Sequence, residues 1–279
     1  MIQRRNTSAG RHVRSVERAI AGSVSVAVSP DRTSMGAAAA ADAAKAILEA
    51  VGDRGRARVV FASAPSQREM LSALAARHDL DWSRVEAFHM DEYLGLPATA
   101  PQAFGQWLND HLFAQVSGGY LNVIDPAARP QAEADRYGAL VMSERLDLVC
   151  LGIGENGHLA FNEPHQAQLE DDRAARVVQL DLQSRRQQVS DGQFDRLDLV
   201  PATAITLTVP TLLSARTIVG TVPGSSKASA VAAALDGPIG TDCPASFLRT
   251  HVAVYLHLDP EAAQRLHPGP SSTGWSVRS

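Results

Sequence analysis

Residues 146–164 read LDLVCLGIGENGHLAFNEP. The unbroken apolar run Leu148–Leu151 is typical of a strand that is covered on both faces of its sheet. The three glycines that follow have the G-x-G-x-x-G spacing of a dinucleotide-binding loop. Such a loop opens a long helix, but here Pro164 comes seven residues after the last glycine, and the residues between them have no helical pattern. We therefore interpret this segment as a buried strand that ends in a tight loop displaying polar side chains.

The rest of the chain alternates short β-branched runs with helical patterns rich in alanine and leucine. Strands are predicted at 24–28, 58–62, 85–89, 146–151, 177–182, 217–222 and 252–258. Helices are predicted at about 35–51, 66–78, 102–115, 131–145 and 225–236. Strand followed by helix, repeated along a chain, implies parallel pairing through right-handed crossovers. The predicted fold class is therefore α/β: a single doubly wound, mostly parallel sheet, Rossmann-like, with helices on both faces.

No linker and no internal repeat divides the chain, so we expect one domain over residues 15–266. Residues 1–14 are polar, and residues 267–279 are rich in proline, glycine and serine; both segments are predicted to be disordered. Cys150 and Cys243 are too few for a disulfide scaffold. No apolar run approaches the roughly 18–20 residues that span a bilayer, and no secretory signal is visible. A cytoplasmic location is therefore predicted.

The charge balance excludes two classes of partner. The 279 residues include 26 Lys and Arg against 30 Asp and Glu, which gives a formal net charge of −4. A mixed, weakly acidic surface indicates neither a nucleic acid nor an anionic membrane as partner. The hydrophobic share of 45% and the charged share of 20% are ordinary for a globular protein. Function must therefore be sought in the motifs.

Ligands of open α/β sheets bind beyond the carboxyl ends of the strands, so the residues directly after each predicted strand are the candidates for a site. After 58–62 come Ser63 and Ser66, whose hydroxyls, with the free N–H groups of a helix start, suit an anion. An ordinary capped turn is the alternative. After 217–222, Lys227 lies in the first turn of a predicted helix, where a cation opposes the helix dipole unless an anion compensates it. The alternative there is a solvated lysine.

Acid/base candidates follow two other strands. Asp91 and Glu92 come after a strand end, and a carboxylate with restricted solvation can act as a base toward a C–H proton next to a carbonyl. A solvated turn capped by Asp91 is the alternative. His158 lies in the glycine loop with Asn156 and Glu163 nearby, and a histidine beside a carboxylate can act as an acid/base near neutral pH. The alternative is a structural histidine.

Arg185 and Arg186 also follow a predicted strand; they could reach an anion or form a solvated helix face. The histidines are scattered without zinc-like spacing, so no metal site is predicted. The G-x-S-x-G elbow of serine hydrolases is absent.

Together these segments resemble the glucosamine-6-phosphate deaminase family, which shares its fold with the 6-phosphogluconolactonases. The resemblance is carried by F-H-M-D-E-Y-L-G-L-P at 88–97 and G-I-G-E-N-G-H-L-A-F-N-E-P at 152–164, with support at 206–213 and 224–228. The segments run in the family's order. The lactonases typically have an arginine after the D-E pair, whereas this chain has Tyr93, which favours the deaminase branch.

The resemblance implies roles for four residues in the acid/base chemistry. Asp91 is implied as the base that moves a proton between C1 and C2 of an opened sugar. His158 is implied as the acid/base that opens the pyranose ring, with Asn156 and Glu163 as the partners that orient and tune it. Many members have Asp where this chain has Asn156, and an Asn cannot stabilise the imidazolium by charge. The implied reaction is aldose–ketose isomerisation of an amino sugar phosphate with loss of ammonia, and it requires no cofactor.

The resemblance also implies a phosphate site made by Lys227 with Ser63 and Ser66. The family's loop at the two serines is commonly T-G-G-T, whereas here Pro65 lies between them and has no N–H to donate. The arginine expected in this site is not evident from the motifs, and Arg185 is the candidate.

Two other functions are kept as alternatives: hydrolysis of a 6-phosphogluconolactone, and a non-catalytic sugar-phosphate sensor. In each case the expected partner is a small phosphorylated sugar, an amino sugar for the deaminase. The sequence is also compatible with a homo-oligomer.

Overall fold

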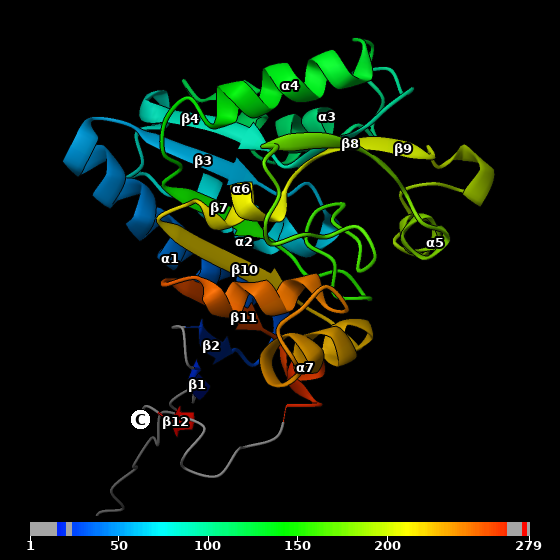
Figure 1. Ribbon diagram of the computed structural model, residues 1–279. Coiled ribbons are helices and arrows are strands. Elements are labelled where there is room, and N and C mark those ends of the chain that lie inside the picture. Colours follow the sequence, from blue (N-terminus) through cyan, green and yellow to red (C-terminus); the bar gives the residue numbers. More distant parts are fainter. Residues whose placement is uncertain (1–15, 21–23, 267–274, 278–279) are drawn as a thin grey trace, which may run out of the picture.

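The computed structural model describes residues 16–20, 24–266 and 275–277. The segment 1–14, expected to be disordered, lies outside the described residues. Within the expected disordered tail 267–279, the described residues form a short strand instead: β12 (Trp275–Val277) pairs antiparallel with β1 (Val16–Ile20). Strands β1 and β12, from opposite ends of the sequence, therefore lie side by side at one edge of the main sheet (Figure 1).

The main sheet has nine strands in the order β12-β1-β2-β11-β10-β7-β3-β4-β6. From β2 to β6, every neighbouring pair is parallel. The bounds of these strands are β2 (Val24–Val28), β11 (Val254–Leu258), β10 (Thr217–Val222), β7 (Leu148–Leu151), β3 (Ala57–Phe61), β4 (Val85–His89) and β6 (Tyr120–Asn122). The prediction of a mostly parallel, doubly wound sheet is confirmed.

Helices cover both faces of this sheet. One face packs against α1 (Arg32–Arg54), α2 (Arg68–Ala75) and α3 (Phe104–His111). The other packs against α4 (Pro130–Val141), α6 (Val209–Leu213), α7 (Ala228–Asp236) and α8 (Pro260–Ala263). Strand β7 contributes Leu148 and Cys150 to the first core and Val149 and Leu151 to the second, as its unbroken apolar run predicts.

A second, smaller sheet is the main departure from the predicted architecture. It is antiparallel, with the order β5-β9-β8, formed by β5 (Asp91–Tyr93), β9 (Thr203–Leu207) and β8 (Ala175–Gln179). The run predicted as a strand at 177–182 therefore lies outside the main sheet and begins earlier. Periodicity reveals that a segment is extended but not which strand it pairs with.

In Figure 1, β3 and β10 point toward the side of the molecule where the small sheet and α5 (Leu182–Ser190) lie. The small sheet thus lies beyond the carboxyl ends of the main strands, and Asp91 begins its strand β5.

Helices α1 and α2 approach each other closely near their first turns. A Cβ at Gly36 would lie 2.5 Å from Cβ of Glu69, so only glycine fits there. Asp31 caps α1 by accepting from the backbone N–H of Ser34 at 2.7 Å. This packing brings Arg32, the first residue of α1, beside the start of α2.

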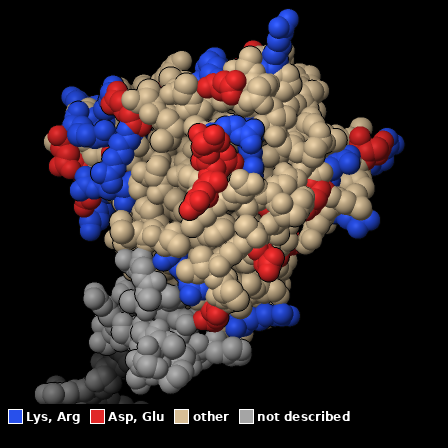
Figure 2. All heavy atoms as spheres, viewed as in Figure 1, with Lys and Arg blue, Asp and Glu red and all other residues tan. Residues whose placement is uncertain are grey.

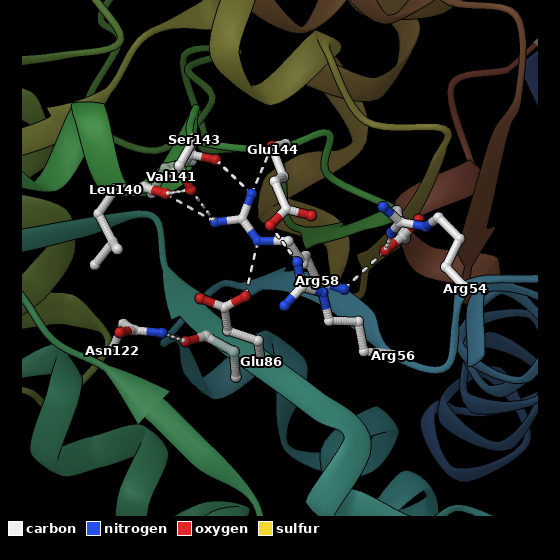
Figure 3. Close-up of polar contacts among 11 residues, drawn as sticks. Arg54, Arg56, Arg58, Glu86, Asn122, Leu140, Val141, Ser143 and Glu144 are labelled. Carbon is white, nitrogen blue, oxygen red and sulfur yellow. Dashed lines mark hydrogen bonds and ion pairs between the residues drawn. The ribbon is translucent and has the colours of Figure 1, made fainter.

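The opposite end of the sheet carries a polar cluster centred on Arg58 (Figure 3). Arg58 is 1% exposed, and its guanidinium donates to the carbonyls of Leu140 and Val141 at 2.8 and 2.9 Å and to Oε2 of Glu86 at 2.9 Å. It also lies 4.9 Å from the ring centroid of Phe88. Arg58 therefore binds carbonyls at the end of α4, where helical hydrogen bonding stops. This cluster stabilises the fold away from the strand ends that carry the candidate residues.

On the face shown in Figure 2, acidic and basic side chains lie next to one another rather than in broad patches of one sign. Among the described residues, no helix is both long and apolar enough to cross a membrane.

Candidate active site

A cavity of about 280 Å³ opens at the carboxyl ends of the parallel strands. Residues that directly follow β3, β4, β7 and β10 line it, which is where the strand-end rule places a ligand. Five of the predicted site residues share this cavity: Ser63, Ser66, Asp91, His158 and Lys227. Asn156 and Glu163 lie behind His158, whereas Arg185 is not part of the lining.

Asp91 is 6% exposed and reaches the cavity from the first position of β5. Burial, and then the nearby charge of Glu92, raise the pKa of Asp91 well above its ordinary value. Asp91 is largely shielded from solvent, and no described residue donates a hydrogen bond to its carboxylate, so its charge is poorly stabilised. A carboxylate in that state is a stronger base than a solvated one.

The neighbouring Glu92 has a different task. Its carboxylate accepts hydrogen bonds from the backbone N–H groups of Tyr93, Phe104 and Gly105, at 2.9, 3.0 and 2.9 Å. Two of these donors are the first residues of α3, which has no cap from its own N-terminal side chain. Burial raises the pKa of Glu92 although the three hydrogen bonds oppose that rise. Glu92 therefore fixes the turn that carries Asp91. Of the two adjacent acids, Glu92 is structural and Asp91 faces the cavity.

His158 is held by Asn156. The Nδ1 atom of His158 lies 2.8 Å from Oδ1 of Asn156, which also accepts the backbone N–H of His158 at 3.1 Å. The Nδ2 group of Asn156 donates to Oε2 of Glu163 at 2.7 Å, and this bond fixes which end of the amide faces the histidine. Because Oδ1 can only accept, Nδ1 carries the proton in the neutral imidazole. The lone pair of Nε2 is then available on the cavity side.

Glu163 is fully buried behind this pair. Burial alone would raise its pKa, but the positive charge of the nearby His158 imidazolium and hydrogen bonds from Ser184 and Asn156 lower the pKa of Glu163 to about 2. Its Oε2 atom is 3.6 Å from Nδ1 of His158. A permanent negative charge at this distance supports the imidazolium, which the neutral Asn156 cannot do by charge.

Two glycines give the loop its shape. A Cβ at Gly154 would lie 2.2–2.4 Å from three ring atoms of His158, so the imidazole lies directly against this backbone. Gly157 has a φ of 86°, in the left-handed region that other residues rarely adopt. These glycines, whose spacing matches a dinucleotide-binding fingerprint, therefore allow the His158 ring to pack directly against the loop backbone.

The other end of the cavity is suited to an anion. Lys227 is 9% exposed, and its Nζ lies 3.9 Å from Oε1 of Glu155, which is too far for a hydrogen bond. Burial lowers the pKa of Lys227, while the charges of Asp191 and Glu155 oppose that shift. Ser66 accepts from Nε2 of Gln67 at 3.0 Å and keeps its hydroxyl proton free to donate. The Ser63 hydroxyl is already engaged, because it donates to the carbonyl of Phe104 at 3.0 Å.

The assignment of Arg185 to the phosphate site is not supported by its position. Its guanidinium donates to the carbonyls of Leu197 and Val200, at 2.9 and 2.8 Å, and does not line the cavity. The position of Arg185 after a predicted strand could not reveal that residues 197–200 would fold back and present their carbonyls to it.

An arginine does line the cavity, but it is Arg32. Its Nε lies 3.1 Å from Oε1 of Glu69, and the guanidinium flanks the loop that carries Ser63 and Ser66. The strand-end rule could have identified Arg32, since it follows β2 by four residues. Ser184, which contacts Glu163 and His158, was also missed and had no comparable signal in the sequence.

Helix α5 and the residues after it cover part of the cavity. The lining from this segment is Gln187, Gln188, Asp191 and Gln193. Oε1 of Gln187 accepts the backbone N–H of Glu155 at 3.4 Å, so the segment is tied to the glycine loop. In the described part of the chain, no three His, Cys, Asp or Glu side chains are grouped as a metal ion would require.

Comparison with known proteins places this chain in a family. Residues 30–256 match the model of the glucosamine-6-phosphate isomerases/6-phosphogluconolactonase family. A glucosamine-6-phosphate deaminase of Exiguobacterium sibiricum is 38% identical over 196 residues, covering 70% of this chain and 76% of that protein. One from Lactobacillus delbrueckii subsp. bulgaricus is 33% identical over 221 residues, covering 79% and 92%.

Solved structures agree with these sequence matches. The structure of a monomeric glucosamine-6-phosphate deaminase superposes with a TM-score of 0.80 at 30% identity, covering 86% of this chain and 99% of that one. A 6-phosphogluconolactonase from Shewanella baltica shares the fold, with a TM-score of 0.72 at 20% identity over 86% of this chain and 99% of that one. The resemblance found in the sequence motifs is thus confirmed, and the chain belongs to the family of glucosamine-6-phosphate isomerases and 6-phosphogluconolactonases.

Proposed function

We propose that this protein is an enzyme that converts glucosamine 6-phosphate, or a closely similar amino sugar 6-phosphate, and water to a ketose 6-phosphate and ammonia. The observation that carries the proposal is that a desolvated carboxylate, an oriented imidazole and a buried lysine line one cavity. The names of the relatives at 38% and 33% identity support the same substrate.

The basic end of the cavity binds the phosphate group of the substrate. The Lys227 ammonium and the Ser66 hydroxyl supply donors, and the Arg32 guanidinium adds a second positive charge from α1. Arginine suits phosphate because its planar fork can make two parallel hydrogen bonds. Binding the phosphate here orients the reacting carbons, which are remote from it.

Ring opening falls to His158. Its Nε2 lone pair accepts the proton of the C1 hydroxyl, and the imidazolium then gives a proton to the ring oxygen as the C1–O5 bond breaks. The products of this step are a C1 aldehyde and a free hydroxyl group on C5, while the amino group on C2 is unchanged. Glu163 stabilises the transient imidazolium through its charge, since its Oε2 is 3.6 Å from Nδ1.

Isomerisation falls to Asp91. Its carboxylate removes the proton from C2, which is acidic because it neighbours the aldehyde, and the resulting enolamine takes a proton at C1. The C2–N bond then has imine character, and water adds to C2 and releases ammonia. The low solvation of Asp91 strengthens it for the carbon-acid step, which is the most demanding of the sequence.

The direct test is an assay of ammonia release with glucosamine 6-phosphate, galactosamine 6-phosphate and their N-acetyl forms. We expect ammonia and ketose phosphate in equal amounts from an unacetylated hexosamine phosphate. Hydrolysis of 6-phosphogluconolactone without ammonia release from any amino sugar would instead assign the lactonase activity. Thermal stabilisation by sugar phosphates without turnover of any would assign a sensor.

A further inference from the structure

Ser184 lies at a defined point in α5. It is 1% exposed, although this helix is otherwise largely solvent-accessible. Its backbone N–H donates to Oδ1 of Asp181 at 2.7 Å, so the cap of α5 fixes where the Ser184 side chain lies. The serine is therefore positioned by the start of its own helix.

The hydroxyl group of Ser184 completes the hydrogen bonding of a buried carboxylate. It donates to Oε1 of Glu163, while Oε2 of Glu163 accepts from Nδ2 of Asn156 at 2.7 Å. Each oxygen of Glu163 thus has one donor, and the donor to Oε1 comes from α5. Loss of the Ser184 hydroxyl would leave Oε1 without a described donor in a fully buried position.

The same hydroxyl also faces the imidazole. Its oxygen lies 3.4 Å from Nδ1 of His158, and because its proton is committed to Glu163, a lone pair is presented to the ring. Nδ1 therefore faces two acceptors, Oδ1 of Asn156 at 2.8 Å and the Ser184 oxygen. Both favour the tautomer that carries its proton on Nδ1.

We infer that Ser184 is a positioning residue for the acid/base histidine: it anchors Glu163 and thereby keeps neutral His158 in the Nδ1–H tautomer, with Nε2 free to take the substrate's proton. The consequence for catalysis rests on the proposed function, whereas the consequence for the tautomer does not. Ser184 does not line the cavity, so it acts through Glu163, Asn156 and His158 rather than on the sugar.

The charged groups around the histidine come from four other elements. Those that share its cavity are Arg32 of α1, Asp91 of β5, Asp191 after α5, and Lys227 beside α7. None of these four groups is hydrogen-bonded to Ser184, whose described partners are Asp181, His158 and Glu163, so the proposed effect can be isolated.

The test uses Ser184→Ala and Ser184→Cys, which remove the strong donor, and Ser184→Thr, which keeps it. Ser190→Ala, at the exposed end of the same helix, is the matched control. The tautomer of His158 is measured without substrate by long-range ¹H–¹⁵N correlation, with its signals identified by their loss in His158→Gln. Steady-state kinetics with the amino sugar phosphate follow on the same samples.

We expect wild type, Ser190→Ala and Ser184→Thr to show the Nδ1–H tautomer. Ser184→Ala or Ser184→Cys, whichever folds, should show mixed tautomers, with kcat about tenfold lower and KM within twofold of wild type. A wild-type tautomer spectrum in the folded Ala or Cys variant overturns the inference, and so does a loss of kcat that Ser184→Thr does not restore. If no amino sugar phosphate is turned over, the proposed function fails while the tautomer measurement still decides the role of Ser184.

Discussion

The Oδ1 atom of Asn156 accepts from both Nδ1 and the backbone N–H of His158, at 2.8 and 3.1 Å. A neutral amide therefore holds the imidazole, and it supplies no charge to the imidazolium. The negative charge that supports the imidazolium lies one group further away, on Glu163. This arrangement orients the ring as firmly as an aspartate would, with a weaker pull on its proton.

Substitution of Asn156 by Asp should make activity more sensitive to acid. The new carboxylate would lie at hydrogen-bond distance from Nδ1 and would stabilise the imidazolium by its charge, so less neutral imidazole would be available as a base. The ratio of activity at pH 6 to activity at pH 8 should therefore be lower in Asn156→Asp than in wild type. Steady-state kinetics at the two pH values measure this ratio, with Asn109→Asp on the exposed face of α3 as control. An unchanged or higher ratio in Asn156→Asp would contradict the role of Asn156 as a neutral acceptor for His158.

Gly154→Ala should disable the enzyme without unfolding it. The added methyl group would lie 2.2–2.4 Å from the His158 ring, so the ring must move away. A displacement of about 1 Å at a reacting group can reduce the rate by about 10²-fold. Turnover and thermal melting should be compared with those of Gly240→Ala, where a Cβ meets nothing within 4 Å. Near-normal turnover in Gly154→Ala would show that catalysis does not depend on the packing of the His158 ring against this backbone.

The basic end of the cavity should govern substrate affinity. Arg32→Gln is expected to raise KM about tenfold and Lys227→Met by up to about 100-fold, because a hydrogen bond to a charged group contributes ~1.5–3 kcal/mol. Arg77→Gln, which removes an arginine paired with Asp79 at 2.5 Å outside the cavity, is the control. Inorganic phosphate should inhibit wild type more strongly than either cavity variant. Equal inhibition of all three would place the phosphate elsewhere.

Asp91→Asn should stabilise the protein at neutral pH. The folded-state pKa of Asp91 is raised, so the protonated acid favours folding below its unfolded pKa of 3.8, and that contribution is lost as pH rises through the folded pKa. Above that range the native state holds a desolvated charge that Asn lacks. The gain in Tm of Asp91→Asn over wild type should therefore be larger at pH 8 than at pH 5. A gain that shrinks as pH rises would contradict the raised pKa.

The strand-end rule explains why much of the site was predictable from the sequence. Ser63, Asp91, His158 and Lys227 each follow a strand of the parallel sheet within a few residues, and parallel strands bring their carboxyl ends to one edge. The fold class followed from the alternation of strand and helix. What local pattern could not supply was the partner of each extended run, so the segment predicted at 177–182 was placed in the wrong sheet.

Arg185 and Arg32 illustrate the same limit for side chains. Both come just after a strand, and nothing in their local sequence distinguishes them. The guanidinium of Arg185 is hydrogen-bonded to the carbonyls of Leu197 and Val200. Arg32 instead reaches the cavity because α1 packs closely on α2 at Gly36. Such tertiary contacts decide which of two similar residues reaches a ligand.

The central claim is that Asp91 moves the proton between C2 and C1, and hydrogen exchange tests it most directly. Wild type and Asp91→Asn are incubated with glucosamine 6-phosphate in D₂O, and deuterium at C1 of the ketose product and at C2 of the remaining substrate is followed by NMR. We predict deuterium incorporation with wild type and none above background with Asp91→Asn, in a variant that still binds the substrate. Exchange at the wild-type rate in Asp91→Asn would assign the base to another group.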